Sequence, residues 1–508
     1  MSIKKILQSD FTKTACTAIL LIALLSVTLL CFSGGISGND FWWHIKVGEW
    51  VVEHNEVPTT DIFSWYGTEK EISWTAHEWL ADVVFYRIHS LGGNVGVFAF
   101  CVVCAFAMIL LMYAQARKHI ERNFLIGGLF LVLFAVVSSL FFYGRPHIFS
   151  YFLLFLELKY LYEFFENPRS RKIYFIPIIA ILWSNLHGGS SNLTYILCLI
   201  FLIAGGFNFT HERVEAKRLD KRALLILLLV TFGTVIGILI NPIGTKVLTY
   251  PYVNLSDNLS MSVISEWQAP DAKVVGNLIL YFFPIFLMTI GIVCGNKKIR
   301  IVDILVMLAF LFLFFRSARF IVLWYIAAVF YAFRYVPEVK IKKVTKRSER
   351  IAVLSLICLL CIPCILGVTD TIKTYKNNTL ISEGMCQEAV QAVKMDAPAR
   401  IYNDYNLGET LIYNDIPVFF DARADLYAQE GIMADGISLM YLEPVNQEYQ
   451  QGYVDVDAMI NKYKFDAVLI LKGRSLYSYI KNHPERFELV YEDDSLGYFR
   501  ICGGQSNE

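Results

Sequence analysis

The sequence predicts a polytopic α-helical membrane protein with about eleven transmembrane helices and a small α/β domain after them. The 508 residues are 56% hydrophobic and only 18% charged, whereas soluble domains carry about 25% charged residues. The mean hydropathy is +0.48, and long apolar runs recur along the chain. From about residue 370 onward the composition becomes that of a soluble domain.

The apolar runs are spaced so that each can supply one transmembrane helix. The predicted spans are 14–33, 94–115, 124–143, 148–165, 173–186, 191–208, 223–241, 275–294, 301–315, 320–336 and 351–369. The first run has an apolar core too long for a cleavable signal peptide, and no small-x-small site follows it cleanly. We therefore expect this run to be retained as the first transmembrane helix.

Basic residues occur in alternate connections between these runs. They are Lys4, Lys5, Lys13, Arg117, Lys118, Arg122, Arg169, Arg171, Lys172, Arg213, Lys217, Arg218, Lys221, Arg222, Lys297, Lys298 and Arg300, followed by the stretch "KIKKVTKRSER". Basic connections stay on the cytoplasmic side of a membrane. We therefore expect a multi-pass protein of the plasma membrane with a cytoplasmic N-terminus and an extracytoplasmic C-terminal domain.

The opposite connections combine ionisable side chains with aromatic residues and helix breakers. They include "NDFWWHIKVGEW", "WTAHEWLAD", "GRPHIFS", "SNLHGGSS", "NPIGTKVLTYPY", "ISEWQAPD" and "FRSARF". In the long first external loop, 34–92, residues 41–54 form an amphipathic pattern that predicts a helix in the membrane interface, and residues 77–90 offer a second. We interpret these connections as the walls of a site at the outer surface.

The sequence divides into a transmembrane domain, 1–369, and an external α/β domain, 370–508. In the second domain "GMCQEAVQAVKM" predicts an amphipathic helix, and "ARIYND", "PVFFDAR" and "DAVLILK" predict short strands. The stretch "FELVYEDDSLGYFRI" predicts a terminal hairpin.

Asp40 lies where the first span ends and the interfacial helix begins. Asp40 or its neighbour Asn39 could cap that helix, and Asp40 could instead be a general base at the membrane surface. Glu78 stands in the same way before the second interfacial helix, where a carboxylate is favourable with the helix dipole. Both are candidate catalytic residues.

Three external histidines, His77, His147 and His187, could converge with Asp40 or Glu266 on a divalent metal ion. Their dispersed spacing leaves ordinary hydrogen-bonded histidines as the alternative. A divalent ion is therefore a candidate cofactor only.

Arg145, Arg316 and Arg319 lie at the outer ends of predicted spans, against the usual distribution of positive charge. An ionisable residue at membrane depth is by default a functional hypothesis, and the planar guanidinium suits phosphate or carboxylate. The alternative is that each side chain reaches toward lipid headgroups.

Two other classes of function fit the pattern less well. A transporter would place polar groups near the bilayer midplane and show an internal repeat, but the polar groups gather at one face. Nucleic-acid binding is not expected, because the basic residues lie in short blocks beside apolar runs.

Several stretches resemble a known family: "NDFWWHIKVGEWVVEHNEVPTTDIFSW", "HEWLAD", "RPHIFSY", "LHGG", "ISEWQAP" and "YNLGETLIYNDIPVFFDARADLY". They look like a group of uncharacterised bacterial members of the GT-C superfamily of membrane glycosyltransferases. That superfamily includes protein O-mannosyltransferases, lipid A aminoarabinose transferases and oligosaccharyltransferases. The order of the chain is also similar, with an acidic residue after the first span, a long first external loop and an external α/β domain.

The resemblance implies inverting transfer of a sugar from a polyprenyl-phosphate-linked donor to a glycan, lipid or protein acceptor. Asp40 would deprotonate or orient the acceptor hydroxyl. The phosphate would be neutralised by Arg145, Arg316 and Arg319, and we assign His147, His187 and Glu266 to the same substrate-binding group.

The chain departs from the resemblance at one point. Several GT-C families carry paired acidic residues in the first external loop, whereas Asp40 is followed by Phe41, Trp42 and Trp43. A second carboxylate would then come from elsewhere, with Glu78 and Glu266 as candidates. The departure also leaves open a non-catalytic or transport protein that handles lipid-linked sugars or exopolysaccharide on the same scaffold.

Overall fold

The computed structural model of the chain describes residues 3–33, 35, 40–120, 124–139, 141–271, 273, 275–295, 297–337, 365–377, 385–428, 430–445 and 454–502. The chain divides into two compact units. The helical unit comprises residues 1–37, 88–241 and 266–381, and the mixed unit comprises residues 38–87, 242–265 and 382–508. Each unit is therefore assembled from three separate segments of the chain.

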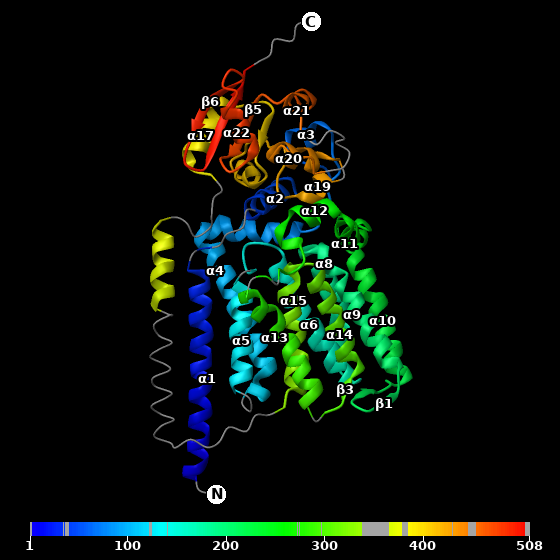
Figure 1. Ribbon diagram of the computed structural model, residues 1–508. Coiled ribbons are helices and arrows are strands. Elements are labelled where there is room, and N and C mark those ends of the chain that lie inside the picture. Colours follow the sequence, from blue (N-terminus) through cyan, green and yellow to red (C-terminus); the bar gives the residue numbers. More distant parts are fainter. Residues whose placement is uncertain are drawn as a thin grey trace. The chain divides into compact units, whose positions relative to one another are not determined.

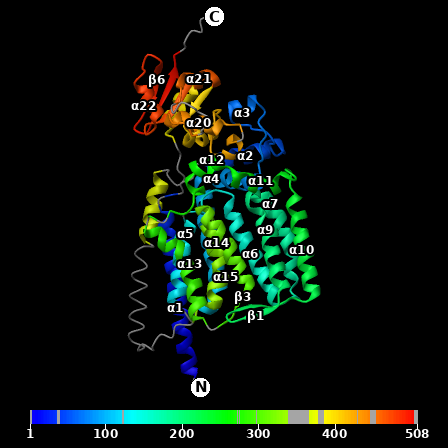
Figure 2. The ribbon, with the colours of Figure 1, turned by 45° about the vertical axis from the view of Figure 1, so that its right-hand side comes forward.

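The helical unit is built from long apolar helices that Figures 1 and 2 show as a bundle. The main helices are α1 (Ile3–Phe32), α4 (Trp79–Ile120, which begins in the mixed unit), α5 (Phe124–Ser139), α6 (His147–Glu166), α7 (Ile176–Leu186), α9 (Leu193–Gly206), α10 (Lys221–Leu239), α13 (Val275–Cys294), α14 (Ile301–Arg316) and α15 (Ile321–Tyr335). A small sheet of β1 (Phe209–His211), β2 (Val214–Ala216) and β3 (Ile299–Arg300) joins two of the helix connections.

These helices coincide in large part with the predicted spans up to residue 336. Among the described residues, four stretches are both long and apolar enough to cross a membrane: Trp79–Arg117, Gly188–Gly206, Lys221–Leu239 and Ala318–Tyr335. Other apolar helices are shorter, such as Thr17–Phe32, Ile126–Ser139 and Ile279–Cys294. The chain is thus a helical protein of membrane character. Of the last predicted span, 351–369, only residues 365–369 lie within the described residues, where they are helical.

Helix α15 lies at the centre of the bundle. All of its residues except Arg334 are buried, and it packs against α5, α6, α13 and α14. Phe330, for example, stacks on Tyr162 with ring centroids 5.4 Å apart. A helix that is apolar on every side is stable only when neighbours cover every side, so α15 organises the helices around it.

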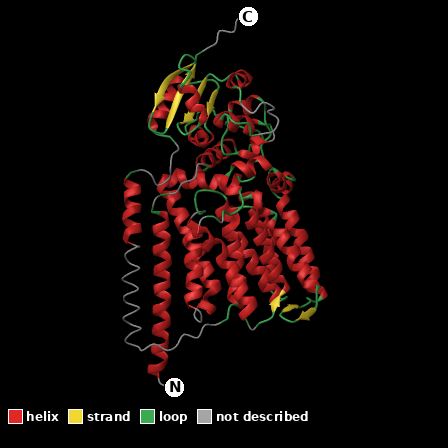
Figure 3. Ribbon diagram, viewed as in Figure 1, coloured by secondary structure: helices red, strands yellow, loops and turns green. Residues whose placement is uncertain are grey.

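The mixed unit contains a four-stranded sheet, which Figure 3 shows in yellow. The strands are β4 (Ile401–Asn403), β5 (Ala467–Leu471), β6 (Phe487–Glu492) and β7 (Leu496–Ile501), in the spatial order β4-β5-β7-β6. Strands β4 and β5 are parallel, and the other pairs are antiparallel. The predicted terminal hairpin is confirmed as β6 and β7, and the predicted amphipathic helix is confirmed as α17 (Gln387–Asp396).

The stretch "PVFFDAR" is not a strand of this sheet, so that prediction is wrong. Val418 makes only an isolated parallel bridge to Ser64, with the Trp65 N–H donating to the Val418 carbonyl at 3.0 Å. The β-rich composition of the stretch reflects burial of Phe419 and Phe420 in the core and not a place in a ladder.

The helices of the mixed unit come from all three of its segments. They are α2 (Phe41–His54), α3 (Trp65–Glu69), α11 (Lys246–Ser256), α12 (Asn258–Val263), α17, α18 (Gly408–Tyr413), α19 (Ala424–Ala428), α20 (Ile432–Tyr441), α21 (Val456–Tyr463) and α22 (Ser475–Lys481), with a 3₁₀ turn at Tyr405–Leu407. Residues from 43–76 and from 385–499 share one hydrophobic core. The segment 38–87 is therefore an integral part of this unit.

Helix α2 matches the predicted amphipathic helix 41–54 and packs closely on the start of α4. A Cβ atom on Gly48 would lie 2.2 Å from the carbonyl oxygen of Asp82, so only glycine allows this approach. The buried His44 side chain also bonds Asp82, with Nδ1 2.6 Å from Oδ1. Gly93, at φ 57 and ψ −153, separates the first part of α4 from the apolar part that follows.

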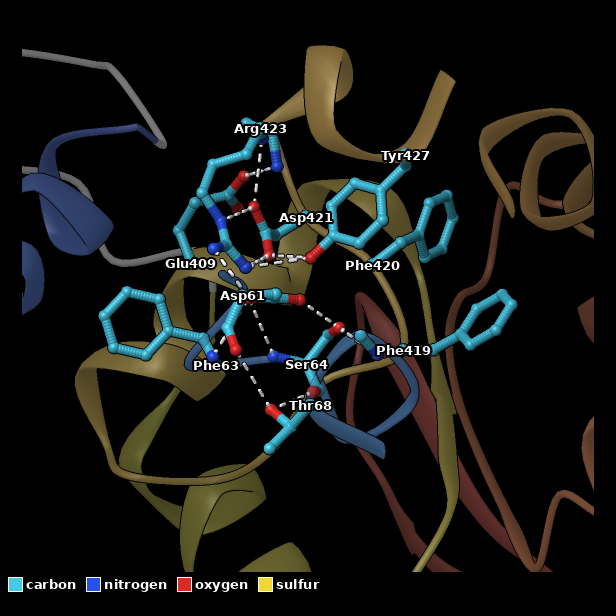
Figure 4. A network of polar contacts seen from close by, with 12 residues as sticks. Asp61, Phe63, Ser64, Thr68, Glu409, Phe419, Phe420, Asp421, Arg423 and Tyr427 are labelled. Carbon is cyan, nitrogen blue, oxygen red and sulfur yellow. Dashed lines mark hydrogen bonds and ion pairs between the residues drawn. The ribbon is translucent and has the colours of Figure 1, made fainter. Parts of the chain in front are cut away.

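A buried guanidinium joins the first segment of the mixed unit to the last (Figure 4). Arg423 donates from Nη1 to Asp61 at 2.8 Å and from Nε and Nη2 to Asp421 at 2.8 and 2.7 Å. Its Nη2 also bonds the Tyr427 hydroxyl at 2.9 Å, and its Cζ lies 4.8 Å from the Trp74 ring centroid. The Asp61, Asp421 and Arg423 side chains are at most 1% exposed, so each charge depends on the others for compensation.

We predict that Arg423→Met lowers the free energy of unfolding of the mixed unit by about 3–5 kcal/mol, because it leaves two buried carboxylates without a cation. Thermal and denaturant unfolding of the purified protein measures this loss. The matched control is Arg400→Met, which breaks a partly exposed pair with Glu69 between the same two segments and should cost about 0–1 kcal/mol. Equal effects of the two variants would contradict the assignment.

Candidate functional site

Three connections of the helical unit meet around Glu266. The connection before α6 contributes Arg145, whose Nη1 lies 2.9 Å from each carboxylate oxygen of Glu266. The connection between α14 and α15 contributes Ser317, whose hydroxyl donates to the Glu266 carbonyl at 3.0 Å. The next residue, Ala318, donates its N–H to the Gln268 carbonyl at 2.9 Å. Motifs "GRPHIFS", "ISEWQAPD" and "FRSARF", far apart in the sequence, are therefore neighbours.

Aromatic rings support the two arginines of this cluster. The Arg145 guanidinium lies 4.8 Å from the Tyr143 ring centroid, and that of Arg319 lies 5.3 Å from the Trp267 ring centroid. Such stacking holds a guanidinium in place while leaving its edge available for hydrogen bonds. We call Arg145, Glu266 and Arg319, with their supporting rings, the arginine cluster.

Two guanidinium groups act on the one carboxylate of the arginine cluster, because Arg145 forms an ion pair with Glu266 and the charge of Arg319 also reaches this group. Burial alone would raise the pKa of Glu266, but the charges of Arg145 and Arg319 outweigh it and lower that pKa to about 2. Glu266 is thus ionised at neutral pH and a poor proton acceptor. It compensates part of the positive charge and orients Arg145.

The other sequence-predicted residues of the helical unit lie as follows. His147, the first residue of α6, hydrogen-bonds the Phe141 carbonyl and has its ring 5.3 Å from that of Tyr143. His187 is 6% exposed, and its Nδ1 lies 2.6 Å from Ser150 Oγ. Arg316 is the half-buried last residue of α14. His147 therefore lies beside the arginine cluster, whereas His187 belongs to a buried hydroxyl network.

Asp40 is the N-cap residue of α2, but its side chain makes no capping hydrogen bond. Its backbone is in the right-handed helical region, with φ −56 and ψ −25, whereas a capping side chain usually goes with an extended backbone. The side chain is half-buried. The capping role considered for Asp40 is not observed, and Asn39 lies outside the described residues.

Glu78 and His77 also belong to the mixed unit. His77 Nε2 is 3.6 Å from Glu78 Oε1, its Nδ1 is 3.1 Å from the Thr75 carbonyl, and its ring lies 4.0 Å from that of Tyr250. Both side chains are mostly buried, at 14% exposed.

No metal cluster forms from the candidate ligands. Across the described part of the chain, no group of three His, Cys, Asp or Glu residues is placed to hold a metal ion. His77, His147 and His187 are each engaged in hydrogen bonds of their own.

The sequence interpretation missed Glu409, the second residue of α18 in the mixed unit. Its side chain is 1% exposed, and its Oε1 accepts the Ala422 N–H at 2.8 Å. A Cβ atom on the preceding Gly408 would lie 2.7 Å from the Asp421 Cβ, so this glycine lets α18 approach the "DAR" stretch. The sequence signal was the dipeptide Gly-Glu in "YNLGETLIYND", a charge directly before an apolar turn.

Comparison with known proteins adds no further constraint. Neither the protein-family models nor the curated proteins contain a match to this chain.

We predict that Glu266→Gln makes the stability of the protein less dependent on pH. A carboxyl whose pKa is lowered on folding stabilises the fold above its unfolded pKa, and this contribution disappears as the pH falls through the folded value of about 2. The variant should therefore unfold at a lower temperature than wild type at neutral pH, with the difference narrowing below about pH 5.

Thermal unfolding across this pH range measures the effect. The matched control is Glu488→Gln, which removes an exposed carboxylate on β6. A constant difference between Glu266→Gln and wild type at every pH would contradict the assigned charge compensation.

Proposed function

We propose that the chain is an inverting membrane glycosyltransferase that moves a sugar from a polyprenyl-phosphate-linked donor to a glycan, lipid or protein acceptor. The observation that carries the proposal is the arginine cluster, in which Arg145 forms an ion pair with Glu266 and the charge of Arg319 acts on the same carboxylate. A phosphate group is the ligand that such a cluster is suited to stabilise. The helical membrane character of the chain supports a lipid-linked substrate.

The proposed division of labour separates phosphate recognition from proton transfer. Arg145 and Arg319, aided by Arg316, neutralise the leaving phosphate, and His147 lies beside them. Asp40 accepts the acceptor's hydroxyl proton as the oxygen attacks the anomeric carbon. The bond from that carbon to the phosphate oxygen breaks, and its electron pair leaves with polyprenyl phosphate. Asp40 is assigned this role because it is a half-buried carboxylate at the start of the amphipathic helix α2.

The proposed membrane arrangement follows the charge distribution. We place eleven spans in the plasma membrane, the N-terminus in the cytoplasm and the domain from about residue 370 on the outer side. Substrate transfer would then take place at the outer face.

The orientation can be tested by labelling single cysteines with a membrane-impermeant reagent in intact cells, in a protein whose own cysteines are replaced by serine. We expect a cysteine at the exposed Asp494 position to react and one at the exposed Lys217 position to remain unlabelled until the membrane is opened. The reverse pattern would overturn the orientation.

We predict that Asp40→Asn lowers the transfer rate by about 10²–10⁴-fold, the usual contribution of a general base. Stability should hardly change, because asparagine keeps the shape and the aspartate makes no capping bond to lose. Donor binding should persist, since it is assigned to the arginines. The measurement is release of polyprenyl phosphate from a panel of polyprenyl-phosphate-linked hexoses when acceptor is added.

The Arg319→Met variant tests phosphate recognition in place of proton transfer. It should weaken donor binding, because donor binding is assigned to the arginines. Wild-type turnover by a folded Asp40→Asn protein would remove Asp40 from the mechanism. Donor binding by wild type without release of polyprenyl phosphate would instead favour the non-catalytic or transport protein.

A further inference from the structure

Helix α18 packs along helix α2 in the mixed unit, with the last residue of α18 against the first turn of α2. The two helices pack against each other, with the Trp42 and Tyr413 ring centroids 4.4 Å apart. One turn further on, Lys46 Nζ pairs with Asp415 Oδ1 at 2.7 Å. Glu409 lies one turn before Tyr413 on the same face of α18, and Asp40 lies two residues before Trp42. The Trp42–Tyr413 contact therefore has both carboxyl-bearing residues on its preceding side.

Glu409 is bound on one oxygen only. Oε1 accepts the Ala422 N–H, whereas Oε2 is buried and has no hydrogen-bond partner among the described residues. A buried carboxylate oxygen without a partner is costly, and a carboxyl group reduces that cost when it holds a proton.

The charges that face Glu409 are both negative. They are Asp40 at the start of α2 and Asp421 in the "DAR" stretch, of which Asp421 is compensated by Arg423 (Figure 4). Burial raises the pKa of Glu409 well above its ordinary value, and the charges of Asp40 and Asp421 raise it further. Burial and the two neighbouring negative charges therefore both favour the protonated form of Glu409.

We propose that Glu409 is the second carboxyl group of the site and shares one proton with Asp40. This role rests on the proposed function of Asp40 as the base. Two adjacent carboxyl groups that hold one proton carry a single negative charge. Glu409 directs its proton toward Asp40 and so orients the carboxylate that receives the acceptor's proton. It is a positioning residue, supplied by the last segment of the chain and not by the loop that carries Asp40.

The first test uses infrared spectroscopy of the full-length protein without substrate, which separates protonated carboxyl groups from carboxylates. We expect the difference spectrum between wild type and Glu409→Gln at neutral pH to contain a protonated carboxyl band, which belongs to Glu409. In Asp40→Asn the band should titrate away at lower pH than in wild type, because one facing negative charge is gone. Asp415→Asn, an exposed carboxyl on the same helix contact, is the control and should leave the band unchanged.

The second test is the pH dependence of transfer. Glu409→Leu should lower the rate by about 10²-fold, the cost of a misplaced reacting group. Glu409→Gln should lower it less, because the amide still donates a hydrogen bond. Wild type should lose activity at alkaline pH as the shared proton leaves, and Glu409→Gln should lack this loss because an amide does not titrate.

The outcomes separate this inference from the proposed function. The absence of a protonated carboxyl band from the difference spectrum of wild type and Glu409→Gln, or an alkaline loss of activity that persists in that variant, overturns the shared proton. If wild type transfers no sugar, the proposed function fails, and the infrared titration alone decides whether the pair shares a proton. If transfer occurs but the band titrates at the same pH in Asp40→Asn as in wild type, the proposed function is retained and the role assigned to Glu409 is wrong.

Discussion

The mixed unit depends on the burial of one guanidinium group. Arg423 lies between Asp61 and Asp421, which are 360 positions apart in the numbering of the chain, and all three side chains are nearly inaccessible to solvent. An uncompensated charge in such a place would cost several kcal/mol. The segments that contain Asp61 and Asp421 must therefore fold together.

This constraint explains why the candidate carboxylates come from distant segments. The ion pair holds the "DAR" stretch against residues 61–74, and Gly408 lets α18 approach that stretch closely. Helix α2 then packs on α18, which brings Asp40 and Glu409 together. The arginine cluster is built differently, because Glu266 compensates its positive charge only in part.

Much of the helical unit could be predicted from the sequence, because its helices are apolar and of regular length. The helix 41–54, the helix at α17 and the terminal hairpin could be predicted for the same reason, since local periodicity determines them. The arginines were found because charge at the end of an apolar run is unusual. Their pairing with Glu266 was not found, since nothing local in the sequence indicates which loops meet.

The sequence-based predictions that failed concern features that tertiary contacts determine and local sequence does not. The stretch "PVFFDAR" has the composition of a strand, yet its aromatic residues fill the core and its charged residues bond Arg423 and its neighbours. Asp40 stands where capping residues usually stand, but its backbone and side chain do not cap. Glu409 gave almost no local signal, because its importance comes from a neighbour 369 positions earlier in the numbering. A buried polar residue in an apolar segment remains the best indication of such a partner.

The central claim is that the Arg423 ion pairs hold α2, which follows Asp40, and α18, which contains Glu409, in one cooperative unit. Hydrogen exchange measured peptide by peptide in wild type and Arg423→Met tests it most directly. The account predicts that α2 and α18 lose protection together in the variant, while α10 of the helical unit keeps its protection. Loss of protection confined to residues near 421–427, with α2 unchanged, would contradict it.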